Sequence, residues 1–169
     1  MEKSRSKLVA LVFGDAYMAE EARATLHRMG GQGLLEIDET ALISKYDDGR
    51  IRTSQDLNVV NGGQKAGHII GLVTAAISGS MPFILAGTVA GKLVGKLMDH
   101  GVTNKFIKNV AKQIQPGTSA LVILARCDEE RRLSVIEKLK TFDPKIIEGD
   151  LPADLECELG ESLTKSAHE

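Results

Sequence analysis

Two stretches of the chain are apolar throughout and lack the alternation of a strand with one solvated face. Residues 8–13 have the sequence LVALVF, and within residues 119–126 (SALVILAR) the apolar run extends from Ala120 to Ala125. A short continuous apolar run is typical of a strand covered on both faces of its sheet. We therefore predict that these two runs are buried neighbours at the centre of one sheet.

Three weaker patterns predict the remaining strands. Residues 35–46 mix apolar and charged positions, as in a half-exposed strand, and residues 51–59 alternate with a two-residue period. The sequence YDDG between them is typical of a turn, so the two strands form a hairpin. The sequence KIIEG at residues 145–149 is a further short strand candidate.

Three segments show helical periodicity. Between residues 15 and 29, apolar side chains recur at Met18, Ala22, Leu26 and Met29, and GGQG follows as a stop signal. A second helix is expected from about residue 103 and ends at QPG, and a third is expected to start at Asp128.

The order of these elements predicts an α+β fold. Strand, helix, strand, strand, helix and strand match a ferredoxin-like βαββαβ sheet, here extended by one helix and one strand. Residues 1–60 and 102–150 are assigned to this domain, and residues 61–101 to an inserted helical hairpin rich in Gly and Ala. Residues 151–169 form an acidic C-terminal helix or tail.

The insert contains 23 residues without a formal charge, from 69 to 91. A straight helix of that length measures about 34 Å, which is enough to span a hydrocarbon core of about 30 Å. However, Pro82 removes a helix hydrogen bond in its middle, so we expect a bend there. The two halves then measure about 20 and 14 Å, which is short of a complete crossing.

Small residues recur every four positions in each half of the insert. The first half contains Gly67, Gly71, Ala75 and Gly79, and the second contains Gly87, Gly91 and Gly95. Such a series, a glycine zipper, lets another helix backbone approach closely. Three interpretations stay open: a hairpin packed on its own sheet, assembly between copies, and embedding in a membrane.

Several of these segments together resemble the uncharacterised bacterial proteins grouped as domain of unknown function 1269. The resemblance rests on LVALVFGDAYMAEEA, on the Gly/Ala-rich insert, on GVTNKFIKNVAKQIQPGTSALVILAR and on the acidic end, and it covers most of the chain. Members of this family are often described as membrane proteins, on the basis of the same apolar insert. The resemblance implies no catalytic residues.

Composition and motifs exclude several function classes. The net charge of −2 provides no basic surface for nucleic acid, and two cysteines without ligand spacing fit the reducing cytoplasm. The stretch AGTVAGKL lacks the hydroxyl residue of a phosphate-binding loop, and no His pair has zinc spacing. We therefore expect no cofactor, no metal site and no catalytic residues.

These patterns favour a non-enzymatic structural protein. We expect it to form homo-oligomers, to attach to the inner face of the membrane, or both, through the glycine-zipper hairpin. The alternative is a small-ligand-binding sensor that uses a ferredoxin-like dimer interface. For that alternative, the only candidate polar face is the alternating strand residues Arg52, Ser54, Asp56 and Asn58.

Overall fold

The computed structural model describes residues 7–57, Ile77 and 101–149. The described elements, in chain order, are β1 (Lys7–Phe13), α1 (Met18–Gly31), β2 (Glu36–Lys45), β3 (Ile51–Leu57), α4 (Gly101–Gln113), β4 (Thr118–Arg126), α5 (Glu129–Lys140) and β5 (Lys145–Gly149). The predicted α+β class is confirmed, since this part of the chain forms one five-stranded sheet and three helices. The predicted insert and acidic tail lie outside the described residues, apart from Ile77.

The strands are arranged in the order β3-β2-β4-β1-β5, and all neighbours are antiparallel. Strands β1 and β4 pair along their whole length, from Lys7 opposite Ala125 to Phe13 opposite Ser119. Every residue from 120 to 124 is buried, as is every residue from 8 to 13 except the half-buried Val9. The prediction of two central, neighbouring strands is confirmed.

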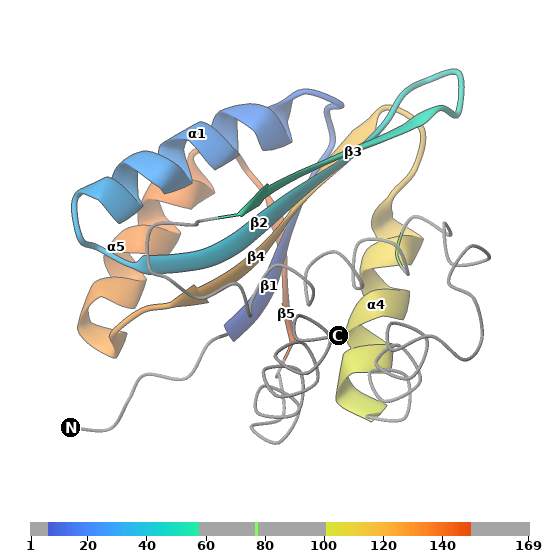
Figure 1. Cartoon of the computed structure of the whole chain (residues 1–169). Helices are drawn as coiled ribbons and strands as arrows, with labels where there is room; N and C mark the ends of the chain where they lie inside the picture. The colour runs from blue at the N-terminus through green and yellow to red at the C-terminus, as the bar shows by residue number, and fades with distance from the viewer. Residues whose placement is uncertain (1–6, 58–76, 78–100, 150–169) are drawn as a thin grey trace, which may run out of the picture.

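Helices cover both faces of this sheet (Figure 1). On one face, α1 and α5 pack against alternate residues of the central strands, including Leu11, Leu121 and Ile123. On the other face, α4 packs against the intervening residues, which include Ala10 and Val122. The two hydrophobic clusters therefore share the central strands and lie on opposite sides of them.

Local sequence explains where α1 lies. Ala19, Ala22, Leu26 and Met29 are its buried residues, and their spacing places them on one face of a helix. The helix ends at Gly31, and Gly33 follows with a positive φ of 71°. That conformation is strained for residues with a Cβ atom, so glycine stops the helix where the sequence predicts.

The expected ferredoxin-like unit included β3 and treated α5 and β5 as an extension. In the structure, β1 and β2 are joined through α1 and lie on either side of β4. Strands β4 and β5 are joined through α5 and lie on either side of β1. Among the described strands β3 pairs with β2 alone, at the edge of the sheet, because it forms the predicted hairpin with that strand.

The expectation that residues 35–46 form a half-exposed strand is wrong. Strand β2 lies between β3 and β4 and is buried from Glu39 to Ser44. Its outer acidic residues, Glu36 and Asp38, form ion pairs with Arg126 of β4 at 3.2 and 2.6 Å. The charged positions therefore reflect a cross-strand cluster at one end and a buried carboxylate at Glu39, and do not indicate a solvated face.

Gly149 allows α4 to approach β5 closely. A Cβ atom at this position would lie 2.8 Å from Phe106 Cδ2 and 2.9 Å from Phe106 Cγ. Phe106 is a buried residue of α4 in the cluster beneath that helix. Because a ring in a packed core has little room to shift, a side chain at residue 149 forces α4 away from the sheet.

We expect Gly149→Ala to lower the free energy of unfolding by about 1–3 kcal/mol, as overpacking does in other cores. Denaturant titration followed by circular dichroism measures the change. Gly14→Ala is the matched control, because a Cβ atom there meets nothing within 4 Å. Equal stabilities of the two variants would contradict the close approach of Phe106.

Candidate functional site

The predicted assembly residues lie outside the described part of the chain. They are Gly67, Gly71, Ala75, Gly79, Gly87, Gly91 and Gly95, so their close packing stays a prediction. Ile77 is the described residue of the insert. Its exposed fraction is 7%, and it belongs to the hydrophobic cluster that contains Ala41, Ile43 and Phe106. The insert therefore contributes at least one side chain to the core on the α4 face.

The polar face of β3 packs toward α1. The Ser54 hydroxyl accepts a hydrogen bond from Arg23 Nη1 at 3.3 Å, and Arg52 is exposed. The side chain of Asp56 and all of Asn58 lie outside the described residues. The described part of this face therefore contributes one hydrogen bond to α1, and neither Arg52 nor Ser54 lines the cleft described next.

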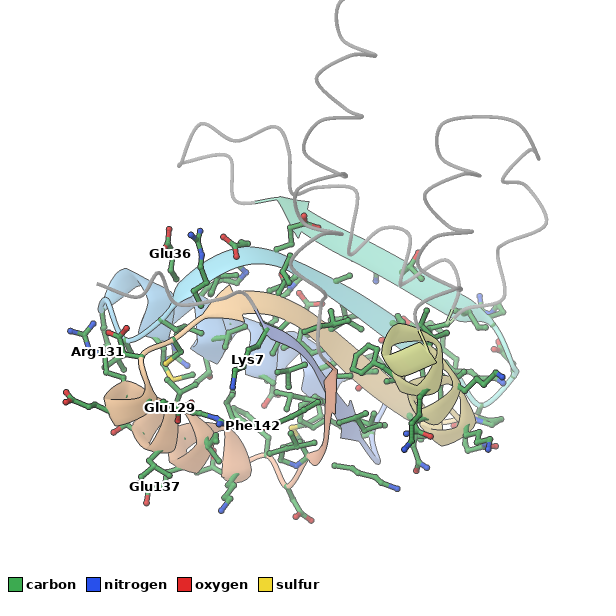
Figure 2. All side chains as sticks on the ribbon, turned by 90° about the horizontal axis from the view of Figure 1, so that it is seen from below. Lys7, Glu36, Glu129, Arg131, Glu137 and Phe142 are labelled. Carbon is green, nitrogen blue, oxygen red and sulfur yellow. The ribbon has the colours of Figure 1, made fainter. Side chains whose placement is uncertain are left out.

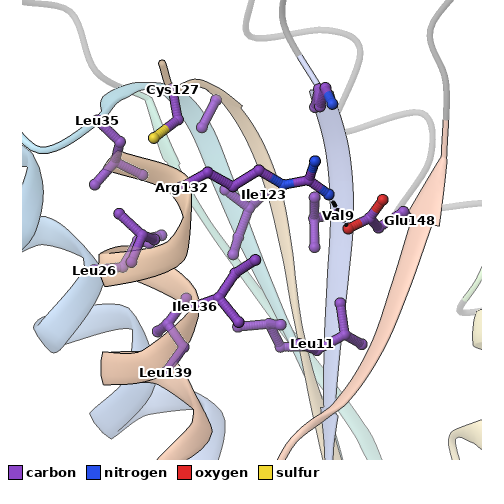
Figure 3. A pocket seen from close by; sticks show the side chains of 14 residues that line it. Val9, Leu11, Leu26, Leu35, Ile123, Cys127, Arg132, Ile136, Leu139 and Glu148 are labelled. Carbon is purple, nitrogen blue, oxygen red and sulfur yellow. Dashed lines mark hydrogen bonds and ion pairs between the residues drawn. The ribbon is translucent and has the colours of Figure 1, made fainter. Parts of the chain in front are cut away.

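An apolar cleft lies between α5 and the sheet (Figure 3). Its volume is about 100 Å³, and most of its lining is aliphatic. The lining residues are Lys7, Val9 and Leu11 of β1, Leu26 and Leu35, Ile123 and Ala125 of β4, Cys127, Arg132, Val135, Ile136 and Leu139 of α5, and Ile146 and Glu148 of β5. The exceptions to this aliphatic lining are the thiol of Cys127 and three charged side chains.

The cleft exists because α5 has a narrow apolar face. Val135 and Leu139 are its buried residues, while Leu133 is 70% exposed. Strand β5 is short and lies at the sheet edge, and Ile146 is 37% exposed there. Since few side chains fill the layer between α5 and the edge of the sheet, the apolar floor at Val9 stays partly open.

Ion pairs line the mouth of the cleft. Arg132 extends from α5 toward β5, and its Nη2 atom lies 2.8 Å from Glu148 Oε1 (Figure 3). Arg132 Nη1 lies 3.5 Å from Glu129 Oε1, and Lys7 Nζ lies 3.8 Å from the same oxygen (Figure 2). The hydrogen bond to Glu148 raises the pKa of Arg132, so the guanidinium group is charged at neutral pH.

Cys127 lies beside the cleft, at the junction of β4 and α5. Its Sγ atom is 3.4 Å from the carbonyl oxygens of Leu34 and Asp128. Burial raises the pKa of this thiol, and the negative charge of Asp128 raises it further. A helix N-terminus such as that of α5 can lower the pKa of a nearby thiol, but here the raised pKa suppresses the thiolate form at neutral pH.

The residues that line the cleft are suited to binding a small ligand. They offer an aliphatic surface, two cations and one carboxylate, and the charged groups are already held in pairs. Within the described ranges, no three His, Cys, Asp or Glu side chains are grouped as metal ligands. The sequence patterns did not identify this site, because Lys7, Arg132 and Glu148 come from three separate elements.

We expect Cys127 to react slowly with a disulfide reagent such as DTNB. In a Cys157→Ser background, its rate at about pH 8 falls below that of a free cysteine peptide, because the raised pKa leaves less thiolate. The rate then increases steeply as the pH passes above the pKa of an ordinary thiol. Asp128→Asn accelerates the reaction at any given pH below the pKa, because it removes one cause of the shift. A rate that is already constant from pH 7 upward would contradict the raised pKa.

Comparison with known proteins identifies the family of the chain. None of the described helices combines the length and the apolar character that a membrane span requires. Neither the curated proteins nor the solved structures provide a match. Residues 60–164 match the family model described as "Protein of unknown function (DUF1269)". Because the match spans more than half of the chain, the protein belongs to the DUF1269 family.

Proposed function

We propose that this protein is a non-enzymatic structural protein that forms homo-oligomers through the glycine series of residues 61–101. The observation that supports this most directly is the burial of Ile77 in the protein's own core. If the insert is helical around Ile77, this burial implies a direction for its other faces, and the small residues of the first half would then face away from the sheet.

The direction follows from helix geometry. At 100° per residue, Ile77 lies about 140° from the mean direction of Gly67, Gly71, Ala75 and Gly79. A helix that places Ile77 against the sheet therefore turns its small-residue face away from it. That face is then available to the second half of the hairpin or to another copy of the chain.

Self-association explains the glycine register better than lipid contact does. Each interior glycine weakens a helix by about 0.8–1 kcal/mol relative to alanine, so a regular series needs a compensating close contact. Lipid acyl chains require no such register, and each half is about 14–20 Å long, shorter than a hydrocarbon core. We place the protein in the cytoplasm, and we treat attachment to the inner face of the membrane as the competing outcome.

We also propose that the scaffold is ferredoxin-like, with a different assignment of strands from that expected. The unit consists of β1-α1-β2 and β4-α5-β5, and β3, the insert and α4 are additions between β2 and β4. The order β2-β4-β1-β5, with its two interleaved crossovers, supports this assignment. Of these additions, β3 lies at the edge of the sheet, and α4 and Ile77 lie on the face opposite α1 and α5.

Size measurement of the purified protein without detergent tests the assembly. We expect the wild-type chain to be an oligomer by light scattering, and the double variant Gly71→Leu, Gly91→Leu to lose most of that mass, because leucine prevents close backbone approach. Leu72→Met is the control, since it conserves side-chain volume next to the series.

Flotation with phosphatidylcholine and phosphatidylglycerol vesicles separates assembly from lipid attachment. Leucine favours insertion into hydrocarbon, so a lipid anchor predicts stronger flotation of the double variant with unchanged mass. That result, or a monomeric wild-type protein, would refute the proposed self-association.

A further inference from the structure

The cleft between α5 and the sheet combines an aliphatic interior with a charged mouth, and the proposed assembly uses neither. It lies on the face covered by α1 and α5, whereas Ile77, the described residue of the insert, is buried in the cluster on the opposite face. Any ligand of this cleft is therefore independent of the glycine series, and the two proposals stand or fall separately.

The size of the interior limits the apolar part of a ligand. An engineered apolar cavity of about 150 Å³ binds benzene, so the roughly 100 Å³ found here suits an alkyl chain of about four to six carbons. Val9 and Leu11 form its floor on β1, and Ile136 forms part of its wall on α5 (Figure 3). These side chains offer no hydrogen bonds, so the inserted group must be a hydrocarbon.

The charges of the mouth determine the polar part. The lining contains two cations, Lys7 and Arg132, and one carboxylate, Glu148. A second carboxylate, Glu129, lies outside the lining and pairs with both cations, at 3.8 Å from Lys7 Nζ and 3.5 Å from Arg132 Nη1. The Glu129 side chain is 77% exposed, so a ligand carboxylate inside the cleft can replace it beside Lys7. An ammonium group would instead meet the two cations of the lining.

Lys7 is the cation placed to meet a ligand carboxylate. Its ion pair with Glu129 is long, at 3.8 Å, and the Lys7 side chain is 50% exposed. The Arg132–Glu148 pair is much shorter, at 2.8 Å, and it ties α5 to β5. A ligand carboxylate can therefore approach Lys7 without breaking the shorter pair.

We propose that this cleft is a binding site for a small monocarboxylate with a short alkyl chain. The chain enters the aliphatic interior over Val9, and the carboxylate lies at the mouth beside Lys7. Dianions such as phosphate monoesters are disfavoured, because Lys7 is a single cation and Arg132 stays paired with Glu148.

Titration of the ¹⁵N-labelled full-length protein with hexanoate tests the site by NMR. We expect saturable shifts of the amides of Val9, Ile136 and their neighbours. Hexylammonium has the opposite charge and acetate lacks the alkyl chain, so each should bind at least about tenfold more weakly than hexanoate. Hexanol, which has the chain but no charge, should also bind more weakly than hexanoate. Equal binding of hexanoate and hexylammonium, or the absence of saturable shifts, would overturn the proposal.

Two charge variants predict opposite changes. Lys7→Gln should weaken hexanoate binding by about two- to fivefold and leave hexanol binding unchanged, as expected for the loss of an exposed ion pair. Glu148→Gln should strengthen hexanoate binding by a similar factor, because it removes the negative charge of the mouth. Both residues are at the surface, so both variants should fold. Identical affinities of the two variants would also overturn the proposal.

A third variant tests the interior. Ala125→Ile adds a branched alkyl group to the part of the floor that β4 contributes and should abolish hexanoate binding. Leu133→Ala is its control, because Leu133 is exposed on α5 and does not line the cleft. Amide shift dispersion establishes whether each variant is folded. Unchanged binding in a folded Ala125→Ile variant would place the ligand elsewhere.

Discussion

The rest of the structure depends on the burial of both faces of the two central strands. Successive side chains of a strand point to opposite faces of its sheet, so a strand without polar positions needs an apolar layer on each side. Strands β1 and β4 meet this condition together, because they pair along their whole length. Helices α1 and α5 form one layer, and α4 with Ile77 contributes to the other.

The two layers are packed differently. Beneath α4, the absence of a side chain at Gly149 brings the ring of Phe106 directly against β5. On the opposite face α5 presents only Val135 and Leu139 as buried residues, and β5 offers a partly exposed Ile146. Close packing on one face thus coexists with an open cleft on the other. Exposed ion pairs contribute about 0–1 kcal/mol, so the charged mouth of the cleft stabilises α5 only weakly.

The described residue of the insert, Ile77, belongs to the closely packed face of the sheet. In the chain, the insert follows the edge strand β3 and precedes α4. Helix α4 contacts β1 and β5, whereas Ile77 shares its cluster with Ala41 and Ile43 of β2. Ile77 thereby adds one side chain to the hydrophobic cluster that α4 covers on this face. The proposed assembly and the proposed ligand site would therefore use different parts of the molecule, since the cleft lies on the other face of the sheet.

The sequence by itself determined the parts of this protein whose environment is encoded in one segment. The uninterrupted runs of β1 and β4 require burial on both faces, the spacing of Ala22, Leu26 and Met29 defines a helix face, and YDDG defines a hairpin. Tertiary structure decided what depends on neighbours. Strand β2 carries charges yet is buried from Glu39 to Ser44, because β3 and β4 flank it, and its less buried acidic end pairs with Arg126. The place of β3 at the edge and of β5 beside β1 also followed from pairing, since strand order depends on contacts between distant segments. The cleft is the clearest case. Its charged residues Lys7, Arg132 and Glu148 come together only when α5 packs over β1 and β5. A local sequence pattern cannot predict contacts between residues so far apart in the chain.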